Sequence, residues 1–257
     1  AGQTTLIERY AEVLAQDGVR CAQVLLTRGD VVDRTGYLNA RNTFERLLEL
    51  GVVPIVNEND TVSVREFSFG DNDMLGAIVA SLIDADSYVI LSDIDGLYTA
   101  NPDTNPDARL IERVERIDAD IIAMAGGAGS TYGTGGMATK IRAARAMIAA
   151  GIPMTICRGR AEHALVSAAD GRGRRTVFEC PGQGSHEQAR KLWIGLAGLS
   201  RGSVSIDAGA VRALESEGAS LLPVGITAVD GTFAEGDTVS VLGPGGQLVG
   251  RGITRYS

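Results

Sequence analysis

The sequence predicts a protein of the α/β class: an α/β sandwich with a mostly parallel sheet, followed by a small domain of β-barrel type. Apolar runs of strand length alternate with segments of helical periodicity over residues 1–180, which is typical of strand–helix–strand units around a parallel sheet. After about residue 185 the apolar segments become short and are separated by turn sequences, which favours a small barrel. We expect a first domain at residues 1–185, a linker at 186–199 and a second domain at 200–257.

The expected elements of the first domain alternate regularly. Strands are expected at residues 19–27, 52–56, 88–91 and 152–156. Helices are expected at residues 3–16, 39–50, 74–83 and from Ile141 to a glycine cap at position 151. Uniformly apolar strands suit a buried parallel sheet, whose ligands bind beyond the carboxyl ends of the strands. In the second domain, strands are expected at residues 204–206, 221–226, 238–241 and 248–250, and a helix at 208–215.

The composition is that of an ordinary globular protein, with 257 residues, 44% hydrophobic and 22% charged. The net charge of −8 argues against nucleic acid or an anionic membrane as the main partner. Three widely spaced cysteines and two histidines provide no zinc-binding constellation, so no metal held by the protein is expected. The sequence shows no signal peptide or membrane span, and a cytoplasmic enzyme is the default expectation. The densest basic group favours a solvated face; it consists of Arg158, Arg160, Arg172, Arg174 and Arg175.

A glycine-rich segment at residues 126–140 carries the functional prediction. Six of its fifteen residues are glycine, and it leads into a helix whose first turn contains Lys140. Free N–H groups and the positive end of the helix dipole favour an anion at such a point. The Walker order is absent, because Thr139 precedes Lys140 and Ile141 follows it. Alone, the segment fits a flexible surface loop with a solvated lysine equally well.

Polar clusters follow two of the predicted strands. N-E-N-D stands at 57–60, G-D-N-D at 70–73, and Ser92-Asp93 follows the next strand. Carboxylates and amides bind an amino group, orient a lysine, or coordinate magnesium beside a phosphate. Asp71 or Asn72 could equally cap the following helix, whereas a functional role is favoured for Asp60 and Asp73. Ser92-Asp93 could form a turn or contact a ribose or phosphate.

The candidate chemistry is phosphoryl transfer. No Ser/His/Asp or Cys/His nucleophile arrangement is available in the sequence, and phosphoryl transfer needs no covalent protein group. It needs positioning and positive charge at the transferring phosphoryl, a role that suits Lys140 and the amides of the glycine-rich segment.

Four motifs together resemble the bacterial glutamate 5-kinases of the amino acid kinase family. They are N-E-N-D (57–60), G-D-N-D (70–73), L-S-D-I-D-G-L-Y-T-A-N-P (91–102) and G-T-G-G-M-A-T-K (133–140). Two further segments, R-G-S-V-S-I-D-A-G-A (201–210) and S-L-L-P-V-G-I (220–226), resemble the PUA domain that follows the kinase domain in these enzymes. The resemblance covers nearly the whole chain, in the order of the family.

The resemblance implies an amino acid kinase-type α/β/α sandwich that phosphorylates the γ-carboxylate of L-glutamate with ATP, the first step of proline synthesis. It implies that Asp60 and Asn72 bind glutamate, that Lys140 stabilises the transferring phosphoryl, and that Asp73 orients the lysines around it. The ATP site that it implies consists of Ser92, Asp93, Thr134, Gly135, Gly136, Met137, Ala138, Thr139 and Lys140. Magnesium would arrive with ATP, held largely by phosphate oxygens and water. Feedback inhibition by proline and a dimer or tetramer also follow from the resemblance.

Two family segments have no counterpart in the sequence, namely the Gly-Lys-Gly-type phosphate loop on the first strand and the later Ser-Gly-Ala substrate loop. The PUA-like part also stops short of the family's full extent. We therefore expect the chain to be a piece of a longer protein. We expect these 257 residues alone to be unstable and inactive.

Three alternatives stay open. The first is another amino acid kinase with a different acceptor, distinguished by what Asp60 and Asn72 bind. The second is an RNA-binding PUA protein; however, residues 200–257 carry four Arg and no Lys against six acids, a net −2 that lacks a basic footprint. The third is a regulatory or structural fragment without activity.

Overall fold

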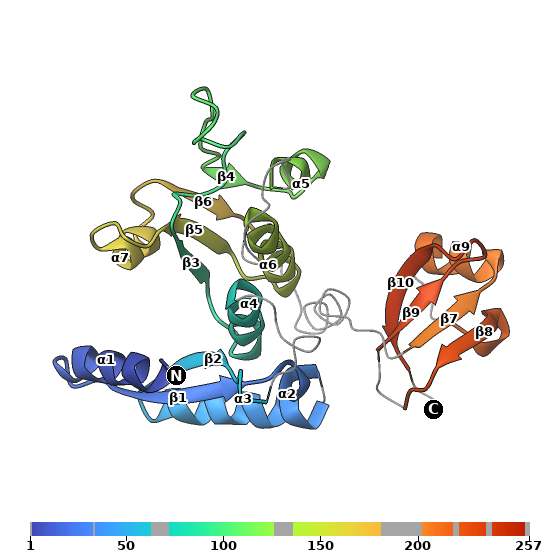
Figure 1. Ribbon diagram of the computed structural model, residues 1–257, viewed down its shortest axis with the longest axis horizontal. Coiled ribbons are helices and arrows are strands. Elements are labelled where there is room, and N and C mark those ends of the chain that lie inside the picture. The colour runs from blue at the N-terminus through green and yellow to red at the C-terminus, as the bar shows by residue number, and fades with distance from the viewer. Residues whose placement is uncertain are drawn as a thin grey trace. The chain divides into compact units, whose positions relative to one another are not determined.

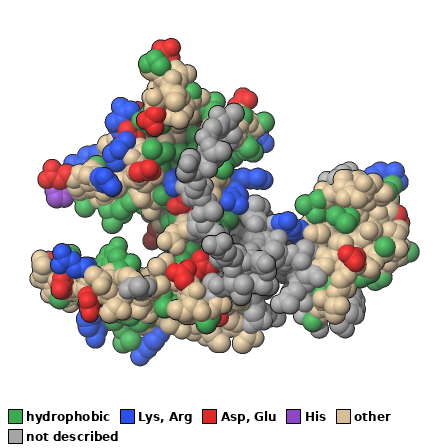
Figure 2. All heavy atoms as spheres, in the orientation of Figure 1, with side chains coloured by type: hydrophobic (Ala, Val, Ile, Leu, Met, Phe, Trp, Pro, Cys, Tyr) green, Lys and Arg blue, Asp and Glu red, His purple; other side chains and the backbone are tan. Residues whose placement is uncertain are grey.

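The computed structural model describes residues 2–32, 34–62, 72–125, 136–180, 202–217, 221–234 and 238–254. The chain divides into two compact units, Ala1–Arg190 and Lys191–Ser257, which are described separately (Figure 1). On the face seen in Figure 2, acidic and basic side chains are interspersed over both units. Within the described ranges, no helix is long and apolar enough to cross a membrane.

The first unit begins with a parallel pair of strands, β1 (Arg20–Leu26) and β2 (Val52–Glu58). Helix α1 (Gln3–Ala15) packs on β1, and α3 (Arg34–Glu49), preceded by the short α2 (Arg28–Val32), packs on β2. A parallel pair needs such a crossover, because a tight hairpin can join only antiparallel strands. Gly51 has a φ of +65°, a left-handed conformation that suits glycine, and it turns the chain from α3 into β2.

The second sheet of this unit has the order β3-β5-β6-β4. Its strands are β3 (Tyr88–Ser92), β5 (Met154–Arg158), β6 (Arg175–Phe178) and β4 (Arg113–Val114). Strands β3 and β5 are parallel, as are β4 and β6, whereas β5 and β6 are antiparallel. The described sheets of the unit are therefore mostly parallel, as predicted.

Helices cover both faces of the second sheet. Figure 1 shows α4 (Asn72–Leu82) and α6 (Met137–Ala150) on one side of the sheet and α7 (Ala164–Ala169) on the other. Helices α4 and α6 pack against each other, and α5 (Ala119–Ala125) packs on α6. The buried side chains of Ile90, Met147, Met154, Ile156 and Phe178 belong to the core of this layer. This packing brings the first turns of α4 and α6 together.

The second unit is a four-stranded sheet with the order β10-β9-β7-β8. Its elements are β7 (Gly202–Ile206), α9 (Ala208–Glu217), the 3-10 turn η2 (Pro223–Gly225), β8 (Ile226–Gly231), β9 (Thr238–Leu242) and β10 (Leu248–Ile253). Strands β7 and β9 are parallel and the other neighbours are antiparallel. Val204, Ile206, Val239 and Val241 form its buried core.

The structure corrects several predicted bounds. Strand β2 continues to Glu58, so that Asn57 and Glu58 belong to the strand and only Asn59 and Asp60 follow it. The strand predicted at 221–226 is wrong: Pro223 opens a 3-10 turn, and β8 starts only at Ile226. The predicted linker at 186–199 lies outside the described residues.

Candidate active site

The carboxyl ends of β3 and β5 define one edge of the second sheet. Ser92, the last residue of β3, is the register partner of Arg158, the last residue of β5. Ligands of parallel α/β sheets bind beyond this edge. The first turns of α4 and α6 carry most of the other described candidates, whereas Asp60 follows β2.

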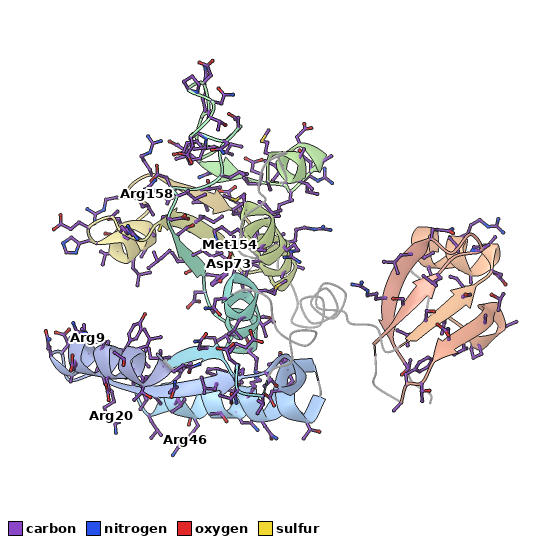
Figure 3. All side chains as sticks on the ribbon, viewed as in Figure 1. Arg9, Arg20, Arg46, Asp73, Met154 and Arg158 are labelled. Carbon is purple, nitrogen blue, oxygen red and sulfur yellow. The ribbon has the colours of Figure 1, made fainter. Side chains whose placement is uncertain are left out.

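A buried ion pair joins the beginnings of α4 and α6. The Lys140 ammonium lies 2.9 Å from Oδ2 of Asp73, and the two side chains are 10% and 16% exposed. In Figure 3, Arg9, Arg20 and Arg46 extend from the outer surface, whereas Asp73 lies where α4 and α6 meet. A pair that is this buried persists only when each charge compensates the other. The structure thus brings together two residues that are 67 positions apart in the sequence.

Thr139 extends this pair toward the beginning of α6. Its hydroxyl lies 3.2 Å from Oδ2 of Asp73 and 2.7 Å from the Gly136 carbonyl, and its single proton can serve only one of them at a time. Gly136 occupies the N-cap position and provides no side-chain acceptor for the first N–H groups of the helix. N–H groups of a first turn lack intrahelical partners, so they suit an anion. Met137 is half-buried and Ala138 is exposed, while Thr134 and Gly135 lie outside the described residues.

The two predicted glutamate-binding residues are exposed. Asn72 is the first residue of α4, directly before Asp73. Asp60 stands in the turn after β2, where the Asn59 N–H donates to the Leu26 carbonyl at 2.9 Å. Helix α4 packs on β2 as well as on β3. Within the described part of the chain, no hydrogen bond or ion pair joins Asp60 directly to Asn72 or Asp73.

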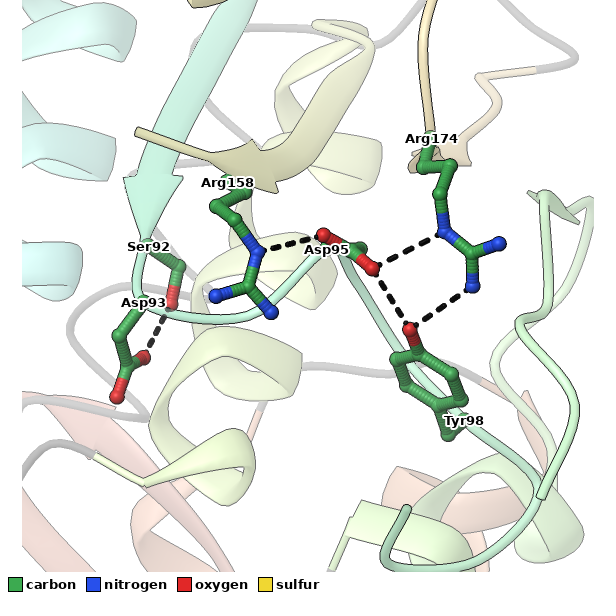
Figure 4. A network of polar contacts seen from close by, with 6 residues as sticks. All are labelled: Ser92, Asp93, Asp95, Tyr98, Arg158 and Arg174. Carbon is green, nitrogen blue, oxygen red and sulfur yellow. Dashed lines mark hydrogen bonds and ion pairs between the residues drawn. The ribbon is translucent and has the colours of Figure 1, made fainter. Parts of the chain in front are cut away.

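The loop after β3 is organised by Asp95, which the sequence analysis did not single out. Ser92 Oγ donates to Oδ1 of Asp93 at 3.0 Å, so these two predicted residues contact each other (Figure 4). Asp95 accepts hydrogen bonds from Arg158 Nε at 2.8 Å, Arg174 Nε at 3.1 Å and the Tyr98 hydroxyl at 2.8 Å. The hydrogen bond from Arg158, opposed by burial, holds the pKa of Asp95 below its ordinary value.

The arginine group that was expected to form a solvated face is mostly exposed, but three of its members also form ion pairs. Arg158 and Arg174 are partly exposed but are bound to Asp95, and Arg172 pairs with Asp170. Arg158, Arg160, Arg172 and Arg174 are exposed, as expected. The contacts with Asp95 arise because the register of β3 and β5 places Arg158 beside the loop after Ser92. The sequence signal that could have indicated this network is Asp95 and Tyr98, which are three residues apart and shortly follow the predicted strand.

Thr176, a residue of β6, holds the same loop in position. Its hydroxyl is fully buried, donates to the Ile111 carbonyl at 2.7 Å and accepts from the Leu97 N–H at 2.8 Å. A Cβ at Gly96 would collide with this hydroxyl and would lie 2.9 Å from the Thr176 nitrogen. Glycine at position 96 therefore allows the loop to approach β6 closely.

The remaining polar groups provide neither a metal centre nor an activated thiol. Within the described ranges, no group of three or more His, Cys, Asp or Glu side chains could hold a metal ion. All three cysteines are free, and burial raises the pKa of the Cys157 thiol. A raised pKa disfavours the nucleophilic thiolate.

Comparisons with known proteins identify the family of the chain. Residues 1–158 match the amino acid kinase family, and residues 202–257 match the PUA domain. The chain is 50% identical over 255 residues to a glutamate 5-kinase of Deinococcus radiodurans, covering 99% of this chain and 69% of that protein. It is 51% identical over 256 residues to a glutamate 5-kinase of Delftia acidovorans, covering 100% of this chain and 66% of that protein.

The chain thus spans about two thirds of the length of these curated relatives. Among solved structures, an isopentenyl phosphate kinase is 20% identical, with a TM-score of 0.48 over 68% of this chain and 66% of that one. The family match covers more than half of the chain, and the relatives are about half identical along its whole length. The chain therefore belongs to the amino acid kinase family, among the glutamate 5-kinases, and carries a PUA domain at its C-terminal end.

Proposed function

We propose that the protein transfers the γ-phosphoryl group of ATP to the γ-carboxylate of L-glutamate and forms L-glutamyl 5-phosphate, the first step of proline synthesis. The observation that carries this proposal is the buried ion pair of Lys140 with Asp73 at the beginnings of α6 and α4. It stands in a chain that is about half identical to glutamate 5-kinases along its length. The proposed kinase domain is 1–185, with a linker at 186–199 and a PUA domain at 200–257.

Lys140 is the proposed catalytic cation. Negative charge on the oxygens of the transferring phosphoryl must be stabilised by groups that are already in position, because reorganisation would raise the barrier. Asp73 holds the ammonium at 2.9 Å. The N–H groups of Met137 and Ala138 at the beginning of α6 suit the same anion, whereas the Thr139 N–H donates to the Gly136 carbonyl at 3.0 Å. Thr134 and Gly135 are assigned to this phosphate site by resemblance alone.

The proposed glutamate site consists of Asp60 and Asn72. The exposed Asp60 carboxylate suits the amino group of the substrate, and the exposed Asn72 amide suits a carboxylate. Asn72 directly precedes Asp73 at the beginning of α4. This adjacency supports placing Asn72 in the same site as the Lys140–Asp73 pair.

The proposed nucleotide site is completed by Ser92 and Asp93 at the end of β3. By resemblance to the family, magnesium would enter with ATP and take its ligands largely from phosphate oxygens and water. Its bound charge would neutralise part of the polyphosphate. By resemblance to the family, we also propose a cytoplasmic homo-oligomer that proline inhibits.

Formation of glutamyl hydroxamate from L-glutamate, ATP and hydroxylamine tests the proposal on the complete protein. Lys140→Ala should lower the rate by at least about a hundredfold, as expected when a preorganised transition-state group is removed. Arg145→Ala is the matched control, since Arg145 is an exposed cation on the same helix. If the folded protein forms no hydroxamate with glutamate but releases ADP with another acceptor, the assignment as a kinase stands and the assignment of glutamate as the substrate is wrong.

A further inference from the structure

We infer that Tyr88 is a positioning residue for the reaction, because its hydroxyl holds the backbone of Asp73 and, through Asp73, fixes Lys140. This inference rests on the proposed function of the Lys140–Asp73 pair. Tyr88 is the first residue of β3, and its hydroxyl donates to the Asp73 carbonyl oxygen at 2.9 Å. The hydrogen bond is partly buried and joins the sheet to the first turn of α4.

Gly76 provides the space for this contact. A Cβ at position 76 would collide with the Tyr88 hydroxyl and would lie 2.9 Å from Cζ of the ring. Glycine weakens a helix interior, so its presence in α4 calls for a reason in the packing. The end of the Tyr88 ring, seated where any side chain at position 76 would stand, is that reason.

Asp73 is consequently held at two separate points. Its carbonyl oxygen accepts from Tyr88, and its carboxylate contacts Lys140 and Thr139. The beginning of a helix frays more readily than its middle, so a side-chain hydrogen bond from the sheet restricts the position of the whole first turn. Because a small displacement of a positioned group costs much of the rate in a reaction that depends on geometry, the Tyr88 hydroxyl contributes to catalysis without touching substrate.

The variant Tyr88→Phe tests this step, since it removes only the hydroxyl. We expect kcat for hydroxamate formation to fall about threefold to tenfold, the effect of one net hydrogen bond on the barrier, with the KM for ATP nearly unchanged. Tyr10→Phe is the matched control, because Tyr10 lies exposed on α1. Full kcat in folded Tyr88→Phe, together with a low kcat in Asp73→Asn, would overturn the inference while the proposed function stands.

A double-mutant cycle separates positioning from mere stabilisation. If the hydroxyl acts through Asp73, Tyr88→Phe lowers kcat in the parent protein but has little further effect in the Asp73→Asn background. A purely structural contribution would instead lower the melting temperature by a similar amount in both backgrounds and leave kcat per folded molecule unchanged. Wild-type activity in both Asp73→Asn and Lys140→Ala would remove the proposed catalytic role of the ion pair, and the inference with it, whereas absence of hydroxamate formation in the folded parent protein would remove the proposed function itself.

A rescue variant provides the remaining readout. In a helix, a serine hydroxyl can donate to the carbonyl three or four residues earlier, and Asp73 lies three residues before position 76. Tyr88→Leu should lower kcat and also leave space over position 76. Gly76→Ser in the Tyr88→Leu background should then restore much of kcat, whereas Gly76→Ala in that background should not. Equal kcat in the serine and alanine versions would contradict a role for the hydrogen bond to Asp73.

Discussion

Replacing Asp73 with asparagine should destabilise the protein more than replacing Lys140 with methionine, although both changes break the same ion pair. Loss of one partner of a buried pair costs about 3–5 kcal/mol when the other charge is left uncompensated. The helix dipoles have opposite effects on the two charges. Asp73 is in the first turn of α4, where the positive end of the dipole favours an anion, whereas Lys140 is in the first turn of α6, where it disfavours a cation.

Each dipole contributes about 0.3–1 kcal/mol, so the two variants should differ by about 1–2 kcal/mol in the free energy of unfolding. Asp73→Asn strands an ammonium that is 10% exposed, while Lys140→Met leaves a carboxylate that still has the Thr139 hydroxyl at 3.2 Å. For a chain of this size, that difference corresponds to about 2–8 °C in the melting temperature.

Thermal unfolding of the complete protein, followed by circular dichroism for both variants, measures this difference. The double variant, with both substitutions in one chain, should melt closer to the parent than Asp73→Asn does, because it leaves no unpaired charge. A melting temperature that is lower for Lys140→Met than for Asp73→Asn would refute the charge–dipole reasoning. Both variants should have a strongly lowered but measurable kcat, whatever the order of their stabilities.

Three further predictions concern the loop after β3. Asp95→Asn should raise the KM for ATP, because Arg158, Arg174 and Tyr98 lose the carboxylate that holds them, and steady-state kinetics at varied ATP measures this. The pKa of Asp95 is lowered on folding, so its stabilising effect is fully present above its ordinary value of 3.8 and is lost as the pH falls toward the lowered pKa. Acid titration should therefore show a shallower loss of stability below about pH 4 for Asp95→Asn than for the parent, and equal slopes would contradict the assignment. Thr176→Val should cost about 1–3 kcal/mol in denaturant unfolding, because the Leu97 N–H and the Ile111 carbonyl lose their buried partner, while Thr176→Ser, which keeps the hydroxyl, should cost clearly less.

The parts of the fold that could be predicted are those in which a local pattern and the tertiary packing agree. Helix α6 has apolar residues at helical spacing and ends at Gly151, whose φ of +80° only glycine adopts readily, and it was expected for those reasons. The strand expected at 221–226 was apolar enough but contains Pro223, which opens a 3-10 turn at that point. Apolar composition alone could not separate these two outcomes.

The candidate site shows the same division. Polar residues beyond the ends of buried strands could be recognised from the sequence. Asp73 and Lys140, in contrast, are 67 positions apart in the sequence, and their contact was expected only by resemblance. The contacts of Asp95 could not be predicted, because they depend on which strand lies beside β3. Arg158 is the last residue of β5 and Arg174 directly precedes β6, and the observed sheet order brings them to one carboxylate.

The two sides of the proposed site differ in how firmly the protein holds them. On the nucleotide side, the loop after β3 is bound by Arg158 from β5 and by Thr176 from β6, so the strands of the second sheet fix it before any ligand arrives. On the acceptor side, Asp60 and Asn72 are exposed residues at the end of one element and the beginning of another. Within the described residues, Asp73 is held both by Tyr88 from the sheet and by Lys140 from α6, and we propose that it lies between the two sides. Precise transfer between two ligands therefore depends on the position of this one carboxylate, which is why a hydroxyl that contacts neither ligand should affect kcat.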